Sequence, residues 1–174
     1  MTRYISRGVT LIEMMIVIAI LSILLAVAAP NFSNLIISNQ ISGNASDFVD
    51  TLRIAKKEAS ARRITVAICV RNGNNCNLNN GTWDDGWLVF LDNNGNNTLD
   101  NGEIVIYQYD ALNPQITFTA VDGNGNALRR LSFTPSGNTN LTGSGAATFT
   151  IGDQDGTIAP RSFSVTVAGH ASPL

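Results

Sequence analysis

An uncharged apolar run near the N-terminus constrains this chain of 174 residues more than any other feature. Residues 14–29 contain no charged side chain, and the 21 residues 9–29 contain only one, Glu13. As a helix, these residues span about 31 Å, which matches the hydrocarbon thickness of a lipid bilayer. Arg3 and Arg7 precede the run and favour a cytoplasmic N-terminus. The pattern therefore predicts a transmembrane helix over 9–29.

A cleaved secretory signal peptide is the main alternative interpretation of this run. A basic stretch, an apolar stretch and the small residues Ala28 and Ala29 are typical of such a signal. Two features disfavour it. The run is longer than the roughly 7–15 apolar residues of an ordinary signal, and Glu13 lies within its apolar first half. A plain membrane anchor that is not processed is a further alternative.

Glu13 needs a partner if it lies in hydrocarbon. A charged side chain at mid-membrane costs on the order of 2.5–3.5 kcal/mol, and less near the end of the helix. A new α-amino group would supply the positive charge if the chain were cut after Gly8. Glu13 would then be the fifth residue of the mature chain, one helical turn from its terminus. It could neutralise its own amine or that of a neighbouring subunit.

The start of the run resembles the signal of type IV pilins in the segment Gly8-Val9-Thr10-Leu11-Ile12-Glu13. The resemblance implies that a prepilin peptidase cleaves after Gly8 and methylates the amine of Val9, which stands where the family usually has Phe. Pro30 would be residue 22 of the mature chain, a position where pilins similarly carry proline. Because proline removes a helical hydrogen bond, we expect Pro30 to kink or locally unwind the helix. Glu13 and Pro30 are thus expected to act in assembly.

Apolar and small residues recur every three or four positions from Phe32 to about Arg63, which is the spacing of an amphipathic helix. Charged residues fall largely off this stripe, and Glu58 with Arg62 forms a favourable pair one turn apart. No linker separates this segment from the apolar run, so we expect one long helix whose second half, 30–63, is amphipathic. The stripe consists of Leu35, Ile41, Ala45, Phe48, Val49, Leu52, Ala55 and Ala59.

After Arg63 the apolar residues alternate, which is typical of half-buried strands. Clusters of Asn, Gly and Asp separate these segments and predict turns, because such residues tolerate positive φ or close turns through their side chains. We therefore predict an α+β fold: a long N-terminal helical spine, transmembrane in its first half, packed on an antiparallel β-sheet head over 64–174 with one core. The strands are expected at Ile64–Val70, Trp87–Leu91, Ile104–Tyr109, Gln115–Ala120, Leu128–Thr134, Ala147–Ile151 and Ser162–Val167.

Three further segments resemble the GspH/FimT group of the type IV pilin-like superfamily, which contains minor pilins and pseudopilins. They are the passage from helix to first strand at 54–69, the segment from Trp87 through Glu103, and Leu131–Gly137. The resemblance implies a single-pass protein of the bacterial inner membrane with a periplasmic head, which later enters a pilus or pseudopilus filament. It implies as partners the lipid bilayer, the prepilin peptidase, the inner-membrane assembly platform, and other major and minor pilins or pseudopilins.

Cys69 and Cys76 are the only cysteines, one at the end of a predicted strand and the other in the loop that follows. In an oxidising periplasm they would close a small disulfide worth about 2 kcal/mol. Two free thiols are the alternative. A metal site at these cysteines would need further ligands, and His170 is the only histidine. We therefore predict a disulfide and no cofactor.

The segment 92–103 places oxygen-bearing side chains at the ligand positions of an EF-hand loop. Its sixth position, where that loop requires Gly, is Asn97, and the flanking elements are predicted strands, not helices. We therefore favour a hairpin loop rich in Asn and Asp without metal, and keep calcium binding as the alternative. The oxygen-bearing residues are Asp92, Asn94, Asn96, Thr98, Asp100 and Glu103.

The charge of the chain disfavours direct DNA binding. Without the first eight residues the chain carries 9 basic and 13 acidic residues, whereas nucleic-acid binders need a basic surface. FimT-type DNA receptors carry an Arg-rich motif near the C-terminus, and the corresponding tail here, Gly169–Leu174, has no arginine. The arginines available for DNA are Arg62, Arg63, Arg129, Arg130 and Arg161.

Three functions remain open at this point. We favour a minor pilin that is incorporated into a type IV pilus, in a complex that primes or caps the fibre for twitching motility, adhesion or DNA uptake. A pseudopilin of a type II secretion system, similar to GspH, shares every feature above and is the second hypothesis. A DNA-uptake receptor similar to FimT is the third. The sequence has no set of nucleophile, base and orienting residue and no phosphate loop, so we do not expect an enzyme.

Overall fold

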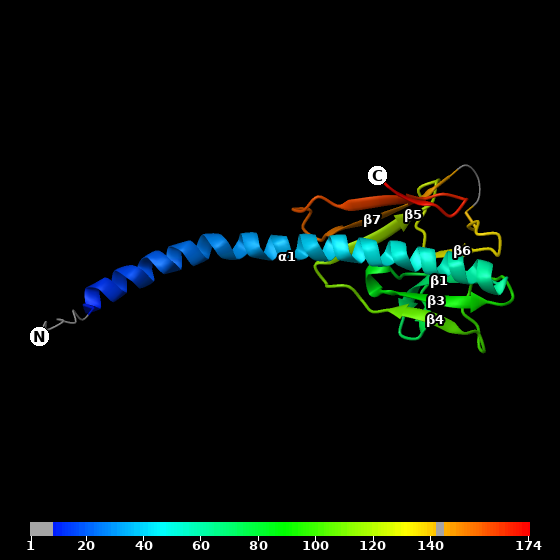
Figure 1. Ribbon diagram of the computed structural model, residues 1–174, viewed down its shortest axis with the longest axis horizontal. Coiled ribbons are helices and arrows are strands. Elements are labelled where there is room, and N and C mark those ends of the chain that lie inside the picture. The colour runs from blue at the N-terminus through cyan, green and yellow to red at the C-terminus, as the bar shows by residue number, and fades with distance from the viewer. Residues whose placement is uncertain (1–8, 142–144) are drawn as a thin grey trace, which may run out of the picture. The chain divides into compact units, whose positions relative to one another are not determined.

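The computed structural model describes residues 9–141 and 145–174, apart from the side chains of residues 26–31 (Figure 1). Contacts within the chain divide it into two compact units, one that ends at Ile36 and one from Ile37 to Leu174. We call them the N-terminal unit and the C-terminal unit.

One helix, α1 (Leu11–Arg62), runs through the N-terminal unit and continues into the C-terminal unit. This confirms the predicted helix on both sides of Pro30, and α1 ends within about one residue of the predicted position. Arg63 follows with a left-handed φ of 57°, a conformation in which many helices end. Glu58 and Arg62 form the expected ion pair, with 2.6 Å between Oε2 and Nε.

The stripe of α1 that is buried in the C-terminal unit differs from the predicted one at its start. Leu35, which was assigned to the stripe, belongs to the N-terminal unit and is exposed, and Ile37 is buried instead. Ala45 and Val49 are half-buried. The buried apolar residues of α1 keep a helical spacing and are Ile37, Ile41, Phe48, Leu52, Ala55 and Ala59.

Every predicted strand forms, with ends that move by at most two residues, and all pairings are antiparallel. The strands form two sheets, and the sequence did not predict how they divide, because alternation reveals a strand but not its partners. The first sheet has the order β2–β1–β3–β4, with β6 also paired to β1, and the second has the order β5–β7–β8–β9. The first sheet contains β1 (Thr65–Asn72), β2 (Asn75–Cys76), β3 (Trp87–Asp92), β4 (Val105–Tyr109) and β6 (Arg130–Phe133), and the second contains β5 (Ile116–Val121), β7 (Ala147–Asp153), β8 (Arg161–Val165) and β9 (Ala171–Pro173).

Three short elements were not predicted: β2, β9 and the 3-10 helix η1 (Trp83–Asp85). β2 has two residues and β9 has three, which is too short for alternation to be recognised. η1 places Trp83 in the core, where its indole Nε1–H donates to the Leu128 carbonyl oxygen at 2.7 Å.

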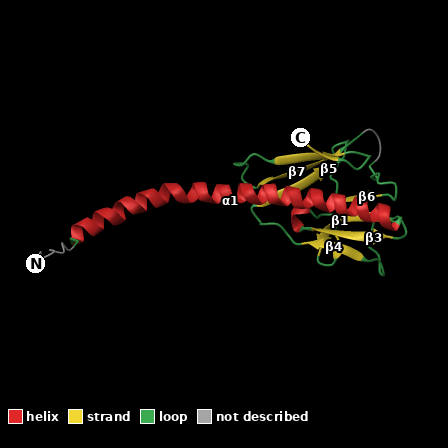
Figure 2. Cartoon of the chain, in the orientation of Figure 1, coloured by secondary structure: helices red, strands yellow, loops and turns green. Residues whose placement is uncertain are grey.

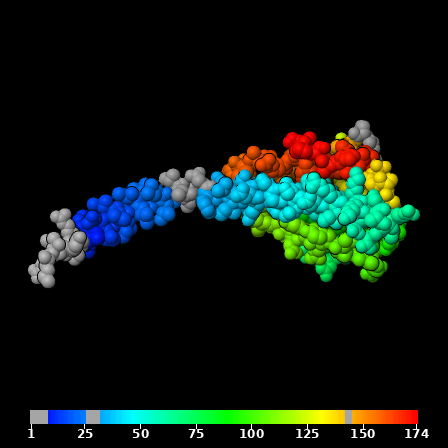
Figure 3. Space-filling view, viewed as in Figure 1, coloured from blue at the N-terminus to red at the C-terminus, as the bar shows by residue number. Residues whose placement is uncertain are grey.

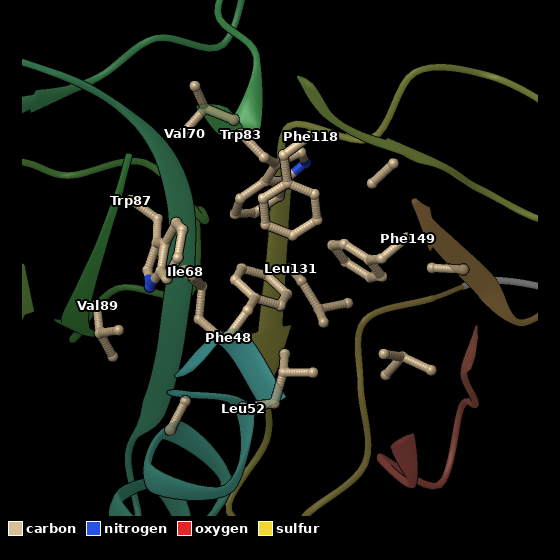
Figure 4. Packing of buried hydrophobic residues seen from close by; sticks show 14 of the residues in the cluster. Phe48, Leu52, Ile68, Val70, Trp83, Trp87, Val89, Phe118, Leu131 and Phe149 are labelled. Carbon is tan, nitrogen blue, oxygen red and sulfur yellow. The ribbon is translucent and has the colours of Figure 1, made fainter. Parts of the chain in front are cut away.

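The C-terminal part of α1 runs along both sheets. In Figures 1 and 2, β5 and β7 lie on one side of the helix and β3 and β4 on the other, and the space-filling view in Figure 3 shows the same order. Phe48 is fully buried at the centre (Figure 4). Its ring centroid lies 5.0 Å from that of Trp87 in the first sheet, and 4.9 and 5.0 Å from those of Phe118 and Phe149 in the second.

The first sheet also buries side chains on its other face, where none of the described helices lies. Ala67, Cys69, Leu88 and Phe90 are fully buried there and form a cluster of their own. The short strand β2 and two loops cover this cluster, since the apolar side chains packed on it are Cys76, Leu78 and Leu99.

Phe48→Ala is expected to destabilise the C-terminal unit by about 3–5 kcal/mol, because it removes the ring that touches both sheets and leaves a cavity. Urea unfolding of the detergent-extracted chain, followed by tryptophan fluorescence, measures the loss. Ile54→Ala is the control. This side chain also lies on α1 but is 40% exposed, so a loss below about 1 kcal/mol is expected. Equal losses for the two variants would contradict the central place of Phe48.

Candidate functional site

The N-terminal candidate residues lie at the start of α1. Val9 and Thr10 precede its first residue, Leu11, and Glu13 lies in its first turn. The Thr10 hydroxyl oxygen accepts a hydrogen bond from the Glu13 backbone N–H at 3.3 Å, so Thr10 caps the helix. A carboxylate in the first turn is also favoured by the helix dipole. The segment that resembles the pilin signal therefore also starts the helix.

Two other predicted N-terminal sites, Gly8 and Pro30, lie wholly or partly outside the described residues. Gly8, the predicted cleavage residue, lies outside the described residues. Pro30 lies within α1, which is continuous through it, but its side chain lies outside the described part of the chain. Local unwinding at Pro30 stays a prediction. Val9 and Glu13 are both exposed, so a group from another molecule can reach them.

The described apolar side chains of residues 9–25 are exposed around the whole helix. A surface helix of a soluble protein would instead bury one apolar stripe. A surface of this kind needs an apolar environment, which lipid or other apolar helices supply. No helix in the described part of the chain has both the length and the hydropathy of a membrane span. The exposed residues up to Leu25 are Val9, Leu11, Ile12, Met14, Met15, Ile16, Val17, Ile18, Ile20, Leu21, Ile23, Leu24 and Leu25.

The predicted disulfide between Cys69 and Cys76 is confirmed. Its sulfur atoms are 1.99 Å apart and its Cα atoms 5.6 Å apart. Cys69 lies on β1 in the small cluster on the outer face of the first sheet, and Cys76 packs on that cluster together with Leu78. The disulfide therefore links β1 to the short strand β2 on this face of the sheet.

The segment 92–103 forms the loop between β3 and β4, and its first carboxylate is enclosed by the loop backbone. The oxygens of the buried Asp92 accept hydrogen bonds from the backbone N–H groups of Gly95, Asn96 and Asn97 at 2.8, 3.1 and 2.9 Å. Asn97 takes a left-handed φ of 59° at the position where an EF-hand loop has Gly. This geometry is the Asp- and Asn-rich hairpin loop that the sequence favoured.

The other carboxylates of this loop also accept donors from the loop. Asp100 Oδ2 accepts from the side-chain amides of Asn94 and Asn96 at 2.8 and 2.7 Å, and these bonds hold the pKa of the Asp100 carboxyl below its usual value. Glu103 accepts from the backbone N–H groups of Asn93 and Asp100 at 2.9 and 3.0 Å. Across the described residues, no three His, Cys, Asp or Glu side chains are grouped so that they could hold a metal ion.

Two of the arginines considered for DNA binding, Arg129 and Arg130, form hydrogen bonds within the head. Arg129 Nε donates to the Gly81 carbonyl oxygen at 3.0 Å, and Arg130 Nη1 donates to the Asn97 carbonyl oxygen at 3.5 Å. Both side chains thereby connect β6 or the segment before it to loops of the first sheet. Arg161 lies at the start of β8 in the second sheet, so the structure does not bring these three arginines together.

Contacts that no sequence pattern predicted hold the C-terminal tail. Ala171–Pro173 forms β9 beside β8, and Lys56 on α1 donates from Nζ to the carbonyl oxygens of Ala168 and Gly169 at 2.9 and 3.2 Å. The only local signal was Gly169, which has a φ of 69° in the turn before β9. A lysine that binds carbonyl oxygens 112 and 113 residues away leaves no pattern in the sequence.

The sequence matches two known families. Residues 44–170 match the family described as type II transport protein GspH. The chain belongs to the GspH family. Residues 4–29 match the prokaryotic N-terminal methylation motif. Together these matches confirm the predicted membership in the GspH/FimT group of the type IV pilin-like superfamily. No curated protein matches the chain.

Solved structures of minor pilins and pseudopilins have a similar fold. FimU, a type IV minor pilin of Pseudomonas aeruginosa, is similar with a TM-score of 0.56 and 20% identity, over 78% of this chain and 89% of that chain. EpsH, a minor pseudopilin of the Vibrio cholerae type II secretion system, gives 0.53 and 13%, over 78% and 96%. A second EpsH structure gives 0.56 and 10%, over 79% and 95%. Family, motif and fold agree on a pilin-like protein of a type IV pilus or a type II secretion system.

Asp122 closes the turn after β5 and is one of the carboxylates of the head whose pKa is lowered. Its Oδ1 accepts hydrogen bonds from the backbone N–H groups of Asn126 and Asn124 at 2.8 and 2.9 Å, and Oδ2 accepts from the Asn126 side-chain amide at 3.2 Å. The bonds from Asn126 hold the pKa of the Asp122 carboxyl below its usual 3.8. Gly125 has a φ of 83°, which a side chain would strain, and lets the turn close around the carboxylate.

Asp122→Asn is therefore expected to reduce the loss of stability at acid pH. The pKa of Asp122 is lower in the folded than in the unfolded chain. The ionised carboxylate therefore adds to the free energy of unfolding above about pH 4, and this stabilisation is lost as the pH falls through the lowered pKa. The variant lacks this titration, so its urea midpoint should fall less between about pH 5 and pH 2 than that of the wild type. Asp155→Asn is the control, since this exposed carboxylate accepts no hydrogen bond from the described residues. An unchanged pH profile in Asp122→Asn would contradict the prediction.

Proposed function

We propose that the chain is a minor pilin that is incorporated into a type IV pilus, within a complex that primes or caps the fibre. The observation that carries the proposal is the N-terminal unit. It is an apolar helix exposed around its circumference, with the carboxylate of Glu13 in its first turn and a methylation motif over residues 4–29. Lipid or a bundle of apolar helices stabilises such a surface. A pilin moves from the lipid bilayer into the bundle of apolar helices of a filament.

The first step is anchoring and processing. Residues 9–29 hold the precursor in the bacterial inner membrane, with residues 1–8 in the cytoplasm and the head, residues 64–174, in the periplasm. The disulfide between Cys69 and Cys76 agrees with an oxidising compartment. A prepilin peptidase then cleaves after Gly8 and methylates the new amine of Val9.

The second step is assembly with other pilins. Glu13, one helical turn from the new terminus, pairs with the amine of a neighbouring subunit and so offsets the cost of a carboxylate among apolar side chains. Pro30 lets the helix unwind locally as it leaves the bilayer, because its backbone nitrogen has no hydrogen to donate. The amphipathic half, residues 30–63, carries the head on the outside of the fibre. Each of these roles is structural, and none asks the chain to catalyse a reaction.

A pseudopilin of a type II secretion system is the second candidate, favoured by the family that residues 44–170 match and by the fold of EpsH. Both candidates use the same anchor, cleavage and pairing. They differ in what fails when the gene is deleted: loss of twitching with normal secretion supports the pilus, and retained exoproteins with normal twitching support the secretion system. Direct DNA capture gains no support, because Arg129 and Arg130 bind carbonyl oxygens of the head itself.

The mass of the membrane-extracted protein tests processing. We expect a mature chain that begins at methylated Val9, detected by intact-mass or N-terminal analysis. Substitution of Gly8 by a bulky residue is expected to leave the eight-residue leader in place, which serves as the control for the size of the precursor. A mature chain that begins near Asn31 would instead identify a removed signal peptide and would overturn the proposal.

Glu13→Ala is expected to leave insertion into the membrane intact and to block incorporation into filaments. The variant removes the carboxylate that pairs with the neighbouring amine, whereas an apolar side chain is at least as well accommodated in lipid. Immunoblots of the membrane fraction and of sheared filaments measure the two effects separately. Asp50→Ala is the matched control, since Asp50 is an exposed carboxylate on the C-terminal part of α1. Normal amounts of the Glu13 variant in filaments would show that the charge pair is unnecessary.

A further inference from the structure

We propose that the free edge of β4 is a docking edge, which accepts an extended strand with basic flanking residues from a partner protein. β4 is an edge strand of the first sheet (Figure 1). Strands at sheet edges bind added strands through backbone hydrogen bonds, unless the edge is closed. The proposal goes beyond filament assembly by the N-terminal helix, because it concerns a surface of the head alone.

The edges of the other long strands are closed. The Phe118 N–H on the free side of β5 donates to Asp84 Oδ1 at 3.4 Å. On the free side of β6, the Ser132 N–H donates to Asn140 Oδ1 at 3.0 Å and the Ser132 carbonyl oxygen accepts from the Asn140 N–H at 3.1 Å. β9 has only three residues, and one of them, Pro173, has no N–H.

The edge of β4 has no such closure. Trp87 is opposite Tyr109, and the Leu91 N–H donates to the Ile104 carbonyl oxygen. The backbone N–H and carbonyl groups of the odd-numbered residues of β3 therefore point toward β4. The alternation then turns the backbone N–H and carbonyl of Gln108 away from β3. No described residue forms a hydrogen bond with these two groups. The strand also lacks the lysine, proline or inward charge that protects many natural edges.

The side chains beside this edge favour an apolar strand. Ile104, Val105 and Tyr107 are 59%, 39% and 38% exposed, although all three are large and apolar or aromatic. Together with the residues between and after them they read Ile-Val-Ile-Tyr-Gln-Tyr, a run with high β propensity and no charge. An added strand would cover this surface as well as pair with the backbone.

A groove at the start of β4 favours a basic residue in the partner. Its volume is about 280 Å³, and it lies between the turn after β1 and the loop before β4. The aliphatic part of a lysine or arginine can pack on Leu99 and Val105 while its charge meets Asp100 and Glu103. No lysine or arginine occurs in residues 92–110, so these carboxylates have no basic neighbour within the segment. Leu99, Asp100, Glu103 and Val105 all line this groove.

Charge also disfavours a second copy of this chain as the partner strand. β4 has Glu103 on one side and Asp110 on the other. Antiparallel pairing of two copies would bring Glu103 near Asp110, and parallel pairing would bring each residue near its own copy, so both arrangements oppose like charges. Arg71 pairs with Asp110 at 2.5 Å, which leaves the Glu103 end the more acidic. A foreign strand with Lys or Arg at its ends avoids this repulsion.

The test uses the full-length chain in detergent and a synthetic peptide of alternating Val and Thr with lysine at both ends. We expect the peptide to bind and to slow hydrogen exchange at the Gln108 amide. Gln108→Pro removes this amide and should weaken binding at least about tenfold. Gln108→Thr is the matched control: it loses the same side chain but keeps the amide, so it should bind within about twofold of wild type. A peptide with glutamate at both ends should bind at least about tenfold more weakly.

Several results would overturn the proposal. They are the absence of binding by the lysine peptide at about millimolar concentration, equal binding to the Pro and Thr variants, and equal binding of the lysine and glutamate peptides. Dimerisation of the chain that Gln108→Pro abolishes, measured by light scattering, would make a second copy the occupant instead. The comparison of the two peptides needs only the wild-type chain, so it stands even if the Pro variant fails to fold. None of these results depends on cleavage after Gly8 or on filament assembly.

Discussion

Burial of Phe48 between the two sheets is the interaction on which the C-terminal unit depends. The sheets share no strand, so the chain needs a side chain that contacts both. Phe48 does this with Trp87 on one side and Phe118 and Phe149 on the other, and Trp83 closes the cluster at a centroid distance of 5.1 Å. Because α1 supplies the ring, the helix is a part of the core of the head and not an attachment to its surface.

Polar contacts fix the helix to both sheets at defined positions. Tyr109 on β4 donates from its hydroxyl to Asp47 Oδ2 at 2.8 Å, and burial together with this bond raises the pKa of Tyr109 to about 12. Lys56 binds the turn between β8 and β9 in the second sheet. A load on the N-terminal part of α1 would therefore reach strands of both sheets. This suits a subunit whose anchor is a helix and whose exposed part is a head.

The predictable parts of the structure are those encoded locally. Periodicity located α1 and the long strands, since it depends only on which face of an element is apolar. It did not assign partners: β5 follows β4 in the chain but joins the other sheet, where it pairs with β7. Leu35 continues the helical spacing but is exposed, so spacing alone does not show where burial begins. The disulfide was predictable because two cysteines allow one intramolecular pairing.

The composition of the head explains why one edge differs from the others. Only 14% of the residues of the whole chain are charged, and the head closes its turns and edges with Asn and Asp side chains, such as Asn140 beside β6 and Asp122 after β5. These short side chains reach backbone groups that a lysine would cover only loosely. In the loop before β4, the Asp92 carboxylate accepts hydrogen bonds from the backbone of that loop. It therefore does not bind the backbone groups at the edge of β4. The same chemistry that seals most of the head thus leaves an apolar edge beside carboxylates, and a basic partner strand complements both.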